Sequence, residues 1–303
     1  MTDGGGSART AMSYRITHGT QYEYADIVPF CQNIVFLTPR SMQGQNCSRH
    51  RLTVHPQPAT LHRQTDYFGN TKTCLSIDEG HRLLKISATS TVELQPAVLP
   101  LLSTSAAWES IRDGLPIDTT PDGLANYQFV FGSPHVSFHE QITEYARQSF
   151  ADGRPILEAV ADFNSRIHGD MAYDPRATTV STPITEVFES RRGVCQDLAH
   201  LMLSGLRSLG LAARYVSGYL RTCTPDGSSG LVGADASHAW VSVYCGDLGW
   251  IDVDPTNNIF PSGDHITVAY GRDFSDVCPV LGMFIGGGDH SLRVEVEVAP
   301  VSD

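Results

Sequence analysis

The stretch Gly193-Val194-Cys195-Gln196-Asp197-Leu198-Ala199-His200 places a cysteine where a turn passes directly into an apolar helical run. One helical stripe then continues through Leu198, Met202, Leu206 and Leu209, and Gly210 follows as a stop signal. The sequence therefore predicts a helix over 195–209 that begins at Cys195. A thiol in the first turn of a helix faces unpaired backbone N–H groups and the positive end of the helix dipole, which favour the nucleophilic thiolate.

Two later segments supply the partners that such a thiol needs. Residues 237–244 read Ser-His-Ala-Trp-Val-Ser-Val-Tyr and open a strand at His238, and residues 249–256 read Gly-Trp-Ile-Asp-Val-Asp-Pro-Thr and end a strand at Asp254. His238 is the candidate general base and acid, and Asp254 is the candidate group that orients its ring. A cysteine on a helix with a histidine and an aspartate on successive strands is typical of papain-like acyl transfer.

These residues resemble the core motifs of bacterial transglutaminase-like proteins, which are G-x-C-x-D, H-A-W and G-W-x-x-x-D-P-T. The motifs stand here at 193–197, 238–240 and 249–256, and the stretches 14–24, 66–70 and 271–277 are also similar to this family. The resemblance implies a papain-like core behind a β-rich N-terminal domain, with Cys195, His238 and Asp254 as catalytic residues. It implies no cofactor.

The pattern along the chain predicts an α+β protein with two domains. A disordered leader (1–12) precedes a β-rich, sandwich-like domain (13–97), a proline-containing linker (98–134) and the catalytic core (135–303). In the first domain, residues rich in β-branched and aromatic types predict strands at 13–24, 32–38, 51–55, 72–77 and 83–94. In the core, helices are expected at 138–150 and 156–168, and strands at 212–220, 238–245, 250–253, 265–270 and 291–298.

Strand pairing constrains the connection between His238 and Asp254. If the two side chains share one face of neighbouring antiparallel strands, the paired residue numbers must add to an even number. A two-residue turn at 247–248 would give odd sums, so we predict an odd-length loop or a bulge between Cys245 and Trp250. Asp252 competes with Asp254 because it lies on the same face, but the D-P-T match favours Asp254.

An acyl intermediate also requires donors for its oxyanion. The backbone N–H of Cys195 is one candidate, and Tyr173 is a candidate side-chain donor, with an ordinary packed tyrosine as the alternative. Trp240 is a candidate for an oxyanion or substrate contact, with core packing alone as the alternative. Asp197 and His200 lie on the catalytic helix and are expected to be structural. The other six cysteines are expected to be buried packing residues.

Composition excludes several classes of partner. The net charge is −12, and Lys72 and Lys85 are the only lysines, so neither nucleic acid nor an anionic membrane is an expected partner. The seven cysteines form no C-x-x-C pair and the start of the chain lacks a signal-peptide pattern, which favours the cytoplasm. No metal site is expected, because His135 and His139 lack the following glutamate of a zinc protease helix and no calcium loop is present.

The sequence leaves the acyl acceptor open. Water would make the protein a peptidase or amidase acting on a peptide or protein substrate, and an amine would make it a cross-linking transglutaminase. A binding module that has lost turnover is the third alternative. The oligomeric state stays open as well.

Overall fold

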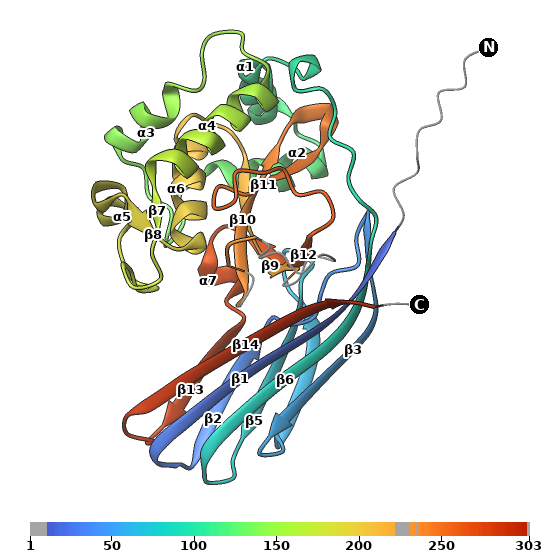
Figure 1. Cartoon of the computed structure of the whole chain (residues 1–303), viewed down its shortest axis with the longest axis vertical. Helices are drawn as coiled ribbons and strands as arrows, with labels where there is room; N and C mark the ends of the chain where they lie inside the picture. Colours follow the sequence, from blue (N-terminus) through green and yellow to red (C-terminus); the bar gives the residue numbers. More distant parts are fainter. Residues whose placement is uncertain (1–10, 222–230, 234–235, 302–303) are drawn as a thin grey trace, which may run out of the picture.

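A computed structural model describes residues 11–221, 231–233 and 236–301. Most of the predicted leader and Cys223 lie outside these residues. Two parts are stacked along the long axis of the molecule: a β-sandwich and a core of helices around a third sheet (Figure 1). The α+β fold class predicted from the sequence is confirmed.

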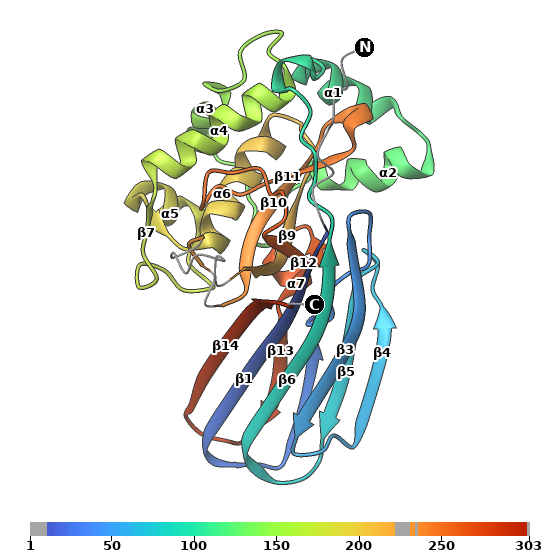
Figure 2. The same ribbon diagram turned by 45° about the vertical axis from the view of Figure 1, so that its right-hand side comes forward.

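Two four-stranded antiparallel sheets form the sandwich (Figure 2). One has the order β14-β1-β6-β3 and the other β13-β2-β5-β4. The strands are β1 (Met12–Val28), β2 (Phe30–Val35), β3 (Gln45–His55), β4 (Thr60–Thr65), β5 (Thr71–Ile77), β6 (His81–Leu94), β13 (Val280–Ile285) and β14 (His290–Pro300). Buried and exposed residues alternate along β6, as expected for a strand with one face on a core. Tyr24, Val35, Ile77 and Leu84 lie between the two sheets.

The last two strands correct the predicted domain boundary. The sequence assigned 135–303 to the core, but β14 pairs with β1 along almost its whole length, and β13 pairs with β2. Residues 280–300 therefore complete the sandwich, and the core is inserted between β6 and β13. The periodicity of residues 291–298 indicated a strand correctly, but strand patterns do not identify which sheet a strand joins.

The core sheet has the order β11-β10-β9-β12 and is antiparallel throughout. Its strands are β9 (Ala213–Leu220), β10 (His238–Tyr244), β11 (Trp250–Val253) and β12 (His265–Gly271). Around it lie α3 (Glu140–Arg147), α4 (Ile156–Asp170), α5 (Ile184–Ser190), α6 (Cys195–Ser208) and α7 (Phe274–Val277), with the short strands β7 (Ala172–Tyr173) and β8 (Arg192–Gly193).

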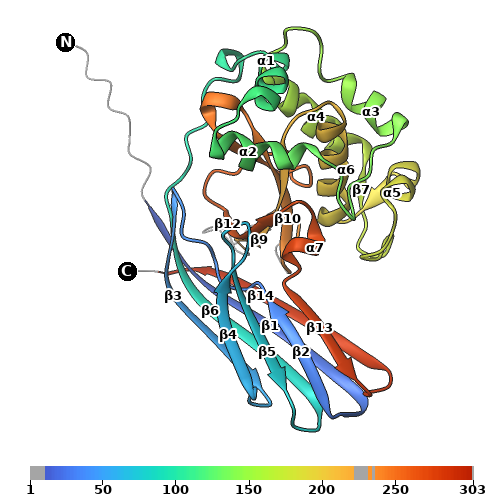
Figure 3. The same cartoon turned by 180° about the vertical axis from the view of Figure 1, so that it is seen from behind.

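The helix α6 packs against the sheet on one side and against α3, α4 and α5 on the other (Figure 3). Gly205 permits this close packing, because a Cβ there would lie 2.6 Å from the ring of Phe163 and 2.9 Å from Ala146. The glycine lowers the intrinsic stability of the helix by about 1 kcal/mol. Burial on all sides therefore fixes α6 and the residue at its start.

The segment predicted as a linker is part of the core. It contains α1 (Trp108–Gly114) and α2 (Pro121–Tyr127), together with short 3₁₀ turns at Leu102–Thr104, Leu115–Ile117 and Gln128–Val130. Trp108 is buried in the main core, and Phe129 packs on Trp250. Prolines in this segment begin or follow helical turns, as at Pro116 and Pro121, rather than marking an open linker.

The predicted parity of β10 and β11 is confirmed. Tyr244 pairs with Trp250 and Val241 with Val253, so paired numbers add to an even value. The connection consists of residues 245–249, an odd number, and contains a 3₁₀ turn at Gly246–Leu248. This register brings His238 and Asp254 to the same end and face of the sheet.

Two carboxamide side chains attach the sandwich to the open edge of β12. Gln45 donates to the carbonyl of Thr267 at 2.7 Å and accepts from its N–H at 2.8 Å. Asn70 does the same with Tyr270, at 2.8 and 3.0 Å. Each carboxamide therefore makes the two hydrogen bonds that a residue of a neighbouring strand would make with β12. Asp66 accepts from the side chain of Asn70, so residues 66–70 serve the docking of the two parts.

We expect Asn70→Ala to destabilise the protein by about 2–4 kcal/mol, because it leaves the partly buried backbone N–H and carbonyl of Tyr270 without their partner and removes one of the hydrogen bonds of the Arg40 guanidinium. Urea unfolding measures the change. Asn46→Ala, at an exposed position of β3, is the matched control and should change stability little. Equal stability of the two variants would contradict this account of the interface.

His18 lies buried in the same interface and makes the stability of the protein dependent on pH. It bonds to Tyr219 and Thr20, each at 3.0 Å, and burial lowers its pKa to about 4. The neutral ring is favoured in the folded state, so its contribution is complete above pH 6.5 and is lost as the pH falls toward 4.

We therefore expect the protonation of His18 alone to lower the free energy of unfolding by up to about 3 kcal/mol as the pH falls between these values. Urea unfolding at a series of pH values tests this. His18→Gln should reduce the loss of unfolding free energy at acid pH, whereas His62→Gln, at an exposed position of β4, should not.

Candidate active site

The turn before α6 is held by the side chain of Asp197. Its carboxylate accepts from the backbone N–H of Val194 at 2.8 Å and from the hydroxyl of Thr178 at 2.6 Å. Gly193 has to be a glycine, because a Cβ there would lie 2.8 Å from the Asp197 side chain. Burial raises the pKa of Asp197, although both hydrogen bonds oppose the shift. The spacing G-x-C-x-D thus fixes the backbone on which Cys195 stands.

Cys195 is the first residue of α6 and is only partly buried. Its backbone N–H makes no hydrogen bond to the described part of the chain, as is usual at the first turn of a helix. The sulfur and this N–H are therefore both available to a ligand at the same helix end.

His238 and Asp254 are in direct contact. Nε2 of His238 bonds to Oδ2 of Asp254 at 2.9 Å, and both side chains are fully buried. Nδ1 of His238 is buried and has no well-aligned hydrogen-bond partner among the described residues. Cys195 is close enough for its charge, and for a hydrogen bond to its sulfur, to act on this ring. Nδ1 is therefore the nitrogen left to exchange a proton with Cys195.

Charges at the site favour a protonated histidine. Burial on its own lowers the pKa of His238, but the charge of Cys195 and the bonds to Asp254 and Cys195 outweigh it and raise the pKa to about 10. Burial acts in the opposite direction on Asp254, yet hydrogen bonds from His238 and His265 hold the pKa of this carboxyl well below its usual range.

Asp254 accepts hydrogen bonds on both oxygens. Oδ1 accepts from the backbone N–H groups of Thr256 at 2.9 Å and Asn257 at 3.2 Å. Oδ2 accepts from His238 and from His265, each at 2.9 Å, and from the side chain of Asn257 at 2.8 Å. A buried carboxylate with this many donors stays ionised and in one orientation.

Asn257 also connects Asp254 with the segment over His238. Its carboxamide accepts from the N–H of Val232 at 2.8 Å and donates to the carbonyl of the same residue at 3.3 Å. The next residue, Gly233, has a positive φ of 90°, and a Cβ there would lie 2.7 Å from Nδ1 of His238. This backbone therefore approaches the ring as closely as only a glycine permits.

Trp240 differs from its predicted role. The side chain has no exposed surface, and its indole N–H donates to Asp252 at 3.0 Å. The donor is thus used, and the ring stacks behind His238 with centroids 6.1 Å apart. Gly218 makes room for it on β9. Trp240 supports the histidine from behind and is neither an oxyanion donor nor a substrate contact in this geometry. Asp252, the alternative to Asp254 in the sequence, accepts this hydrogen bond from Trp240 instead of orienting His238.

Tyr173 lies on β7 beside Gly193, which precedes Cys195 by two residues, and is 38% exposed. Its position next to the start of α6 keeps it a candidate for contact with an oxyanion or substrate.

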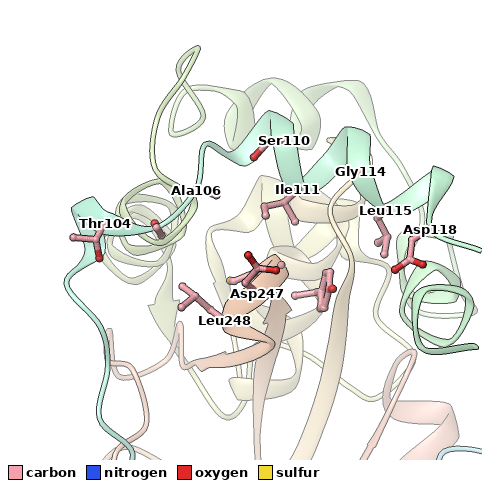
Figure 4. Close-up of a pocket in the computed structure, with 13 residues that line it drawn as sticks. Thr104, Ala106, Ser110, Ile111, Gly114, Leu115, Asp118, Asp247 and Leu248 are labelled. Atoms are coloured by element: carbon pink, nitrogen blue, oxygen red, sulfur yellow. The ribbon is translucent and has the colours of Figure 1, made fainter. Parts of the chain in front are cut away.

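The other histidines of interest are His135, His139 and His200, of which the last lies on α6. His135 stacks on His200, with ring centroids 5.2 Å apart, and His139 bonds to Ser137. A polar cavity of about 420 Å³ is lined by these histidines and by Asp197. A second cavity, of about 500 Å³, lies between α1 and the β10–β11 turn, at the opposite end of β10 from His238 (Figure 4).

One cluster in the described chain has the composition of a metal site. The ligand atoms of His238, Asp254 and His265 lie within 4.8 Å of one another. Both imidazoles, however, bond to the same carboxylate oxygen at 2.9 Å, which is the usual length of an N–H···O hydrogen bond. Hydrogen bonding accounts for the arrangement.

Three residues at the site were missed by the sequence interpretation: His265, Asn257 and Gly233. Asn257 follows the D-P-T motif directly, so its position gave a weak signal. His265 opens a strand after a loop, and unlike His238 it has no motif around it that would single it out among the 12 histidines.

Comparison with known proteins places the chain in a family. The bacterial transglutaminase-like N-terminal region matches residues 14–93, and the transglutaminase-like superfamily matches residues 143–255. The chain belongs to the bacterial transglutaminase-like family. Uncharacterized proteins of Mycobacterium tuberculosis and Mycobacterium bovis are 39% identical to it over 296 residues, which cover 95% of this chain and 92% of theirs.

Two further proteins are similar to this chain, one in fold and one in part of its sequence. The crystal structure of a candidate cysteine protease from Cytophaga hutchinsonii superposes with a TM-score of 0.76 at 22% identity, covering 97% of this chain and 92% of that one. A protein-glutamine gamma-glutamyltransferase of Pseudomonas aeruginosa is 33% identical over 124 residues, which span 40% of this chain and 18% of that protein. Among the described residues, no helix combines the length and apolar character needed to cross a bilayer.

We expect Gly233→Ala to damage the site without unfolding the protein. The added methyl group would collide with His238 Nδ1, and the positive φ adds about 1 kcal/mol of strain. The rate of Cys195 alkylation should fall, while the melting temperature changes by only a few degrees. Gly153→Ala, also at positive φ but with open space around its Cβ, is the control and should leave the alkylation rate unchanged.

Proposed function

We propose that the protein is a cysteine-dependent acyl-transfer enzyme that forms a thioester on Cys195 from a peptide or amide substrate. The observation that carries the proposal is the buried His238–Asp254 pair, whose free Nδ1 serves a partly accessible cysteine at the start of a helix. Membership of the transglutaminase-like family supports the same reaction class.

In the proposed first step, the Cys195 thiolate attacks the carbonyl carbon of the amide, and a carbon–sulfur bond forms. The backbone N–H of Cys195 donates a hydrogen bond to the oxyanion, and Tyr173 is the proposed side-chain donor. The proton on Nδ1 of His238 passes to the leaving nitrogen as the carbon–nitrogen bond breaks. Asp254 holds the Nε2–H throughout, so the ring neither turns nor exchanges tautomers.

In the second step, neutral His238 takes a proton from the incoming nucleophile, which attacks the thioester. The carbon–sulfur bond breaks, and the thiolate–imidazolium pair forms again. We favour water as this nucleophile, so that the protein acts as a peptidase or amidase. The similarity to the Pseudomonas transferase over 124 residues supports an amine as the second candidate.

We propose that the substrate is a peptide or protein and that the sandwich restricts which of these reach the site. The sandwich is fixed to β12 beside His265 and supplies no nucleophile to the site, so we assign it the role of limiting access. The six described cysteines are all free thiols, which is consistent with the cytoplasm as the proposed compartment.

Iodoacetamide alkylation of Cys195 tests the proposed pair. The raised pKa of His238, about 10, keeps the imidazolium present across neutral pH, so the alkylation rate should be nearly constant there and change again near pH 10. Asp254→Asn should move this upper change to lower pH. A single inflection near about pH 8.5, as for an isolated thiol, would contradict the pairing.

Mass spectrometry on a library of peptides, with and without an added primary amine, tests turnover. Cys195→Ala should abolish the acyl-enzyme adduct, whereas Asp254→Asn should keep a residual rate lower by roughly 10⁴-fold. Cys278→Ala is the control for a second partly buried thiol and should behave as the unsubstituted protein. Products that carry the amine would select the transferase alternative, and the absence of any adduct with every substrate would favour a binding module.

A further inference from the structure

The carboxylate that orients His238 is shared with a second histidine. His265, the first residue of β12, places its Nε2 at 2.9 Å from Oδ2 of Asp254, the same oxygen and the same distance as for His238. Its side chain is 2% exposed. None of the family motifs in the sequence contains this residue.

We propose that His265 is a positioning residue of the acyl-transfer site: it divides the negative charge of Asp254 between two imidazoles and so determines how readily His238 releases its proton. The proposal rests on the proposed function and adds to it a residue that never touches the substrate.

A packing role alone does not account for a histidine here. Nδ1 of His265 is buried and has no hydrogen-bond partner among the described residues, and a buried unpaired polar atom costs about 1–3 kcal/mol. A leucine or phenylalanine would fill the space without this cost. The Nε2–H bond to Asp254 is the feature that an apolar residue would lose.

The ring is also held firmly in place. Trp240 meets it edge to face, with centroids 5.0 Å apart and planes at 89°. The same tryptophan stacks on His238, so one indole fixes both imidazoles against one carboxylate. His238 and His265 themselves lie 6.0 Å apart, centroid to centroid.

The charged groups near this arrangement are few. His238 faces Asp254 after β11 and Cys195 on α6. Beside His265, Asp264 is paired with Arg221 of the segment after β9, at 3.1 Å, so its charge is largely compensated. Asp254 is thus the main negative charge that both rings share.

The chemical consequence follows from the shared oxygen. A second N–H donor on Oδ2 lowers the electron density that this oxygen offers to His238. The imidazolium then holds its Nδ1 proton less tightly, which suits a group that must pass the proton to a leaving nitrogen and take one back in each cycle. Without His265, Asp254 would over-stabilise the imidazolium.

The test compares His265→Gln with His265→Asn. The glutamine amide is separated from Cβ by the same number of bonds as Nε2 of histidine and can still donate to Asp254, whereas the asparagine amide is one methylene too short. His265→Asn should raise the upper inflection of the Cys195 alkylation profile by about one pH unit and lower peptide turnover roughly tenfold. His265→Gln should keep the profile and most of the turnover.

His50→Asn is the matched control, because it removes a partly buried histidine of the sandwich that bonds to Thr38 and Ser90 rather than to Asp254. It should lower stability and leave the alkylation profile unchanged. A His265→Asn profile identical to that of the unsubstituted protein, or shifted to lower pH, would overturn the proposal even if the variant were less stable.

Alkylation requires no substrate, so the two proposals fail separately. If no peptide or amine is turned over but the profile still shifts in His265→Asn, the proposed function fails and the charge sharing stands. If the asparagine variant does not fold, NMR of ¹⁵N-histidine in the unsubstituted protein decides. The Nε2–H signal of His265 should move when His238 loses its proton, and a signal that stays fixed would overturn the proposal.

Discussion

One buried negative charge organises the candidate site. Asp254 has no exposed surface, and ionised carboxylates in such surroundings are costly unless donors surround them. The protein supplies these donors from β10, from β12 and from the turn after β11. Each donor is in turn fixed by something else: His238 and His265 by Trp240, and Asn257 by Val232. The orientation of the histidine that faces Cys195 is therefore a property of three segments at once, not of a single contact.

The junction between the two parts of the molecule also depends on a few side-chain hydrogen bonds. Edge strands expose unpaired backbone groups, and proteins cover them to prevent unwanted pairing. Here the edge of β12 is covered by two side-chain amides, Gln45 and Asn70, each of which satisfies both the N–H and the carbonyl of one residue. Because His265 opens that strand, the sandwich stabilises the backbone on which one of the donors to Asp254 stands.

Local sequence patterns predicted much of this structure, and the features that they missed depend on long-range contacts. The apolar stripe after Cys195 placed α6 correctly, and the assumption that His238 and Asp254 share one face correctly predicted an odd-length connection between their strands, because both arguments use short-range regularities. The same reasoning assigned Trp240 to the cleft, since a motif gives a residue's neighbours in sequence but not the partner of its indole N–H. His265 and the pairing of β14 with β1 depend on contacts across the fold, which leave no periodic trace in a single sequence.

The insertion of the core between β6 and β13 has a consequence for biosynthesis. As the chain leaves the ribosome, β1 and β2 appear first, but their neighbours β14 and β13 are made only after the whole core. Both sheets thus lack their last strand, and β1 and β2 stay unpaired on one side, until the core has been made, which is a situation in which strands of separate chains can pair wrongly. A folding core that brings residues 280–300 back to the start of the chain gives β1 and β2 their missing neighbours, so the inserted core is the part that completes the sandwich.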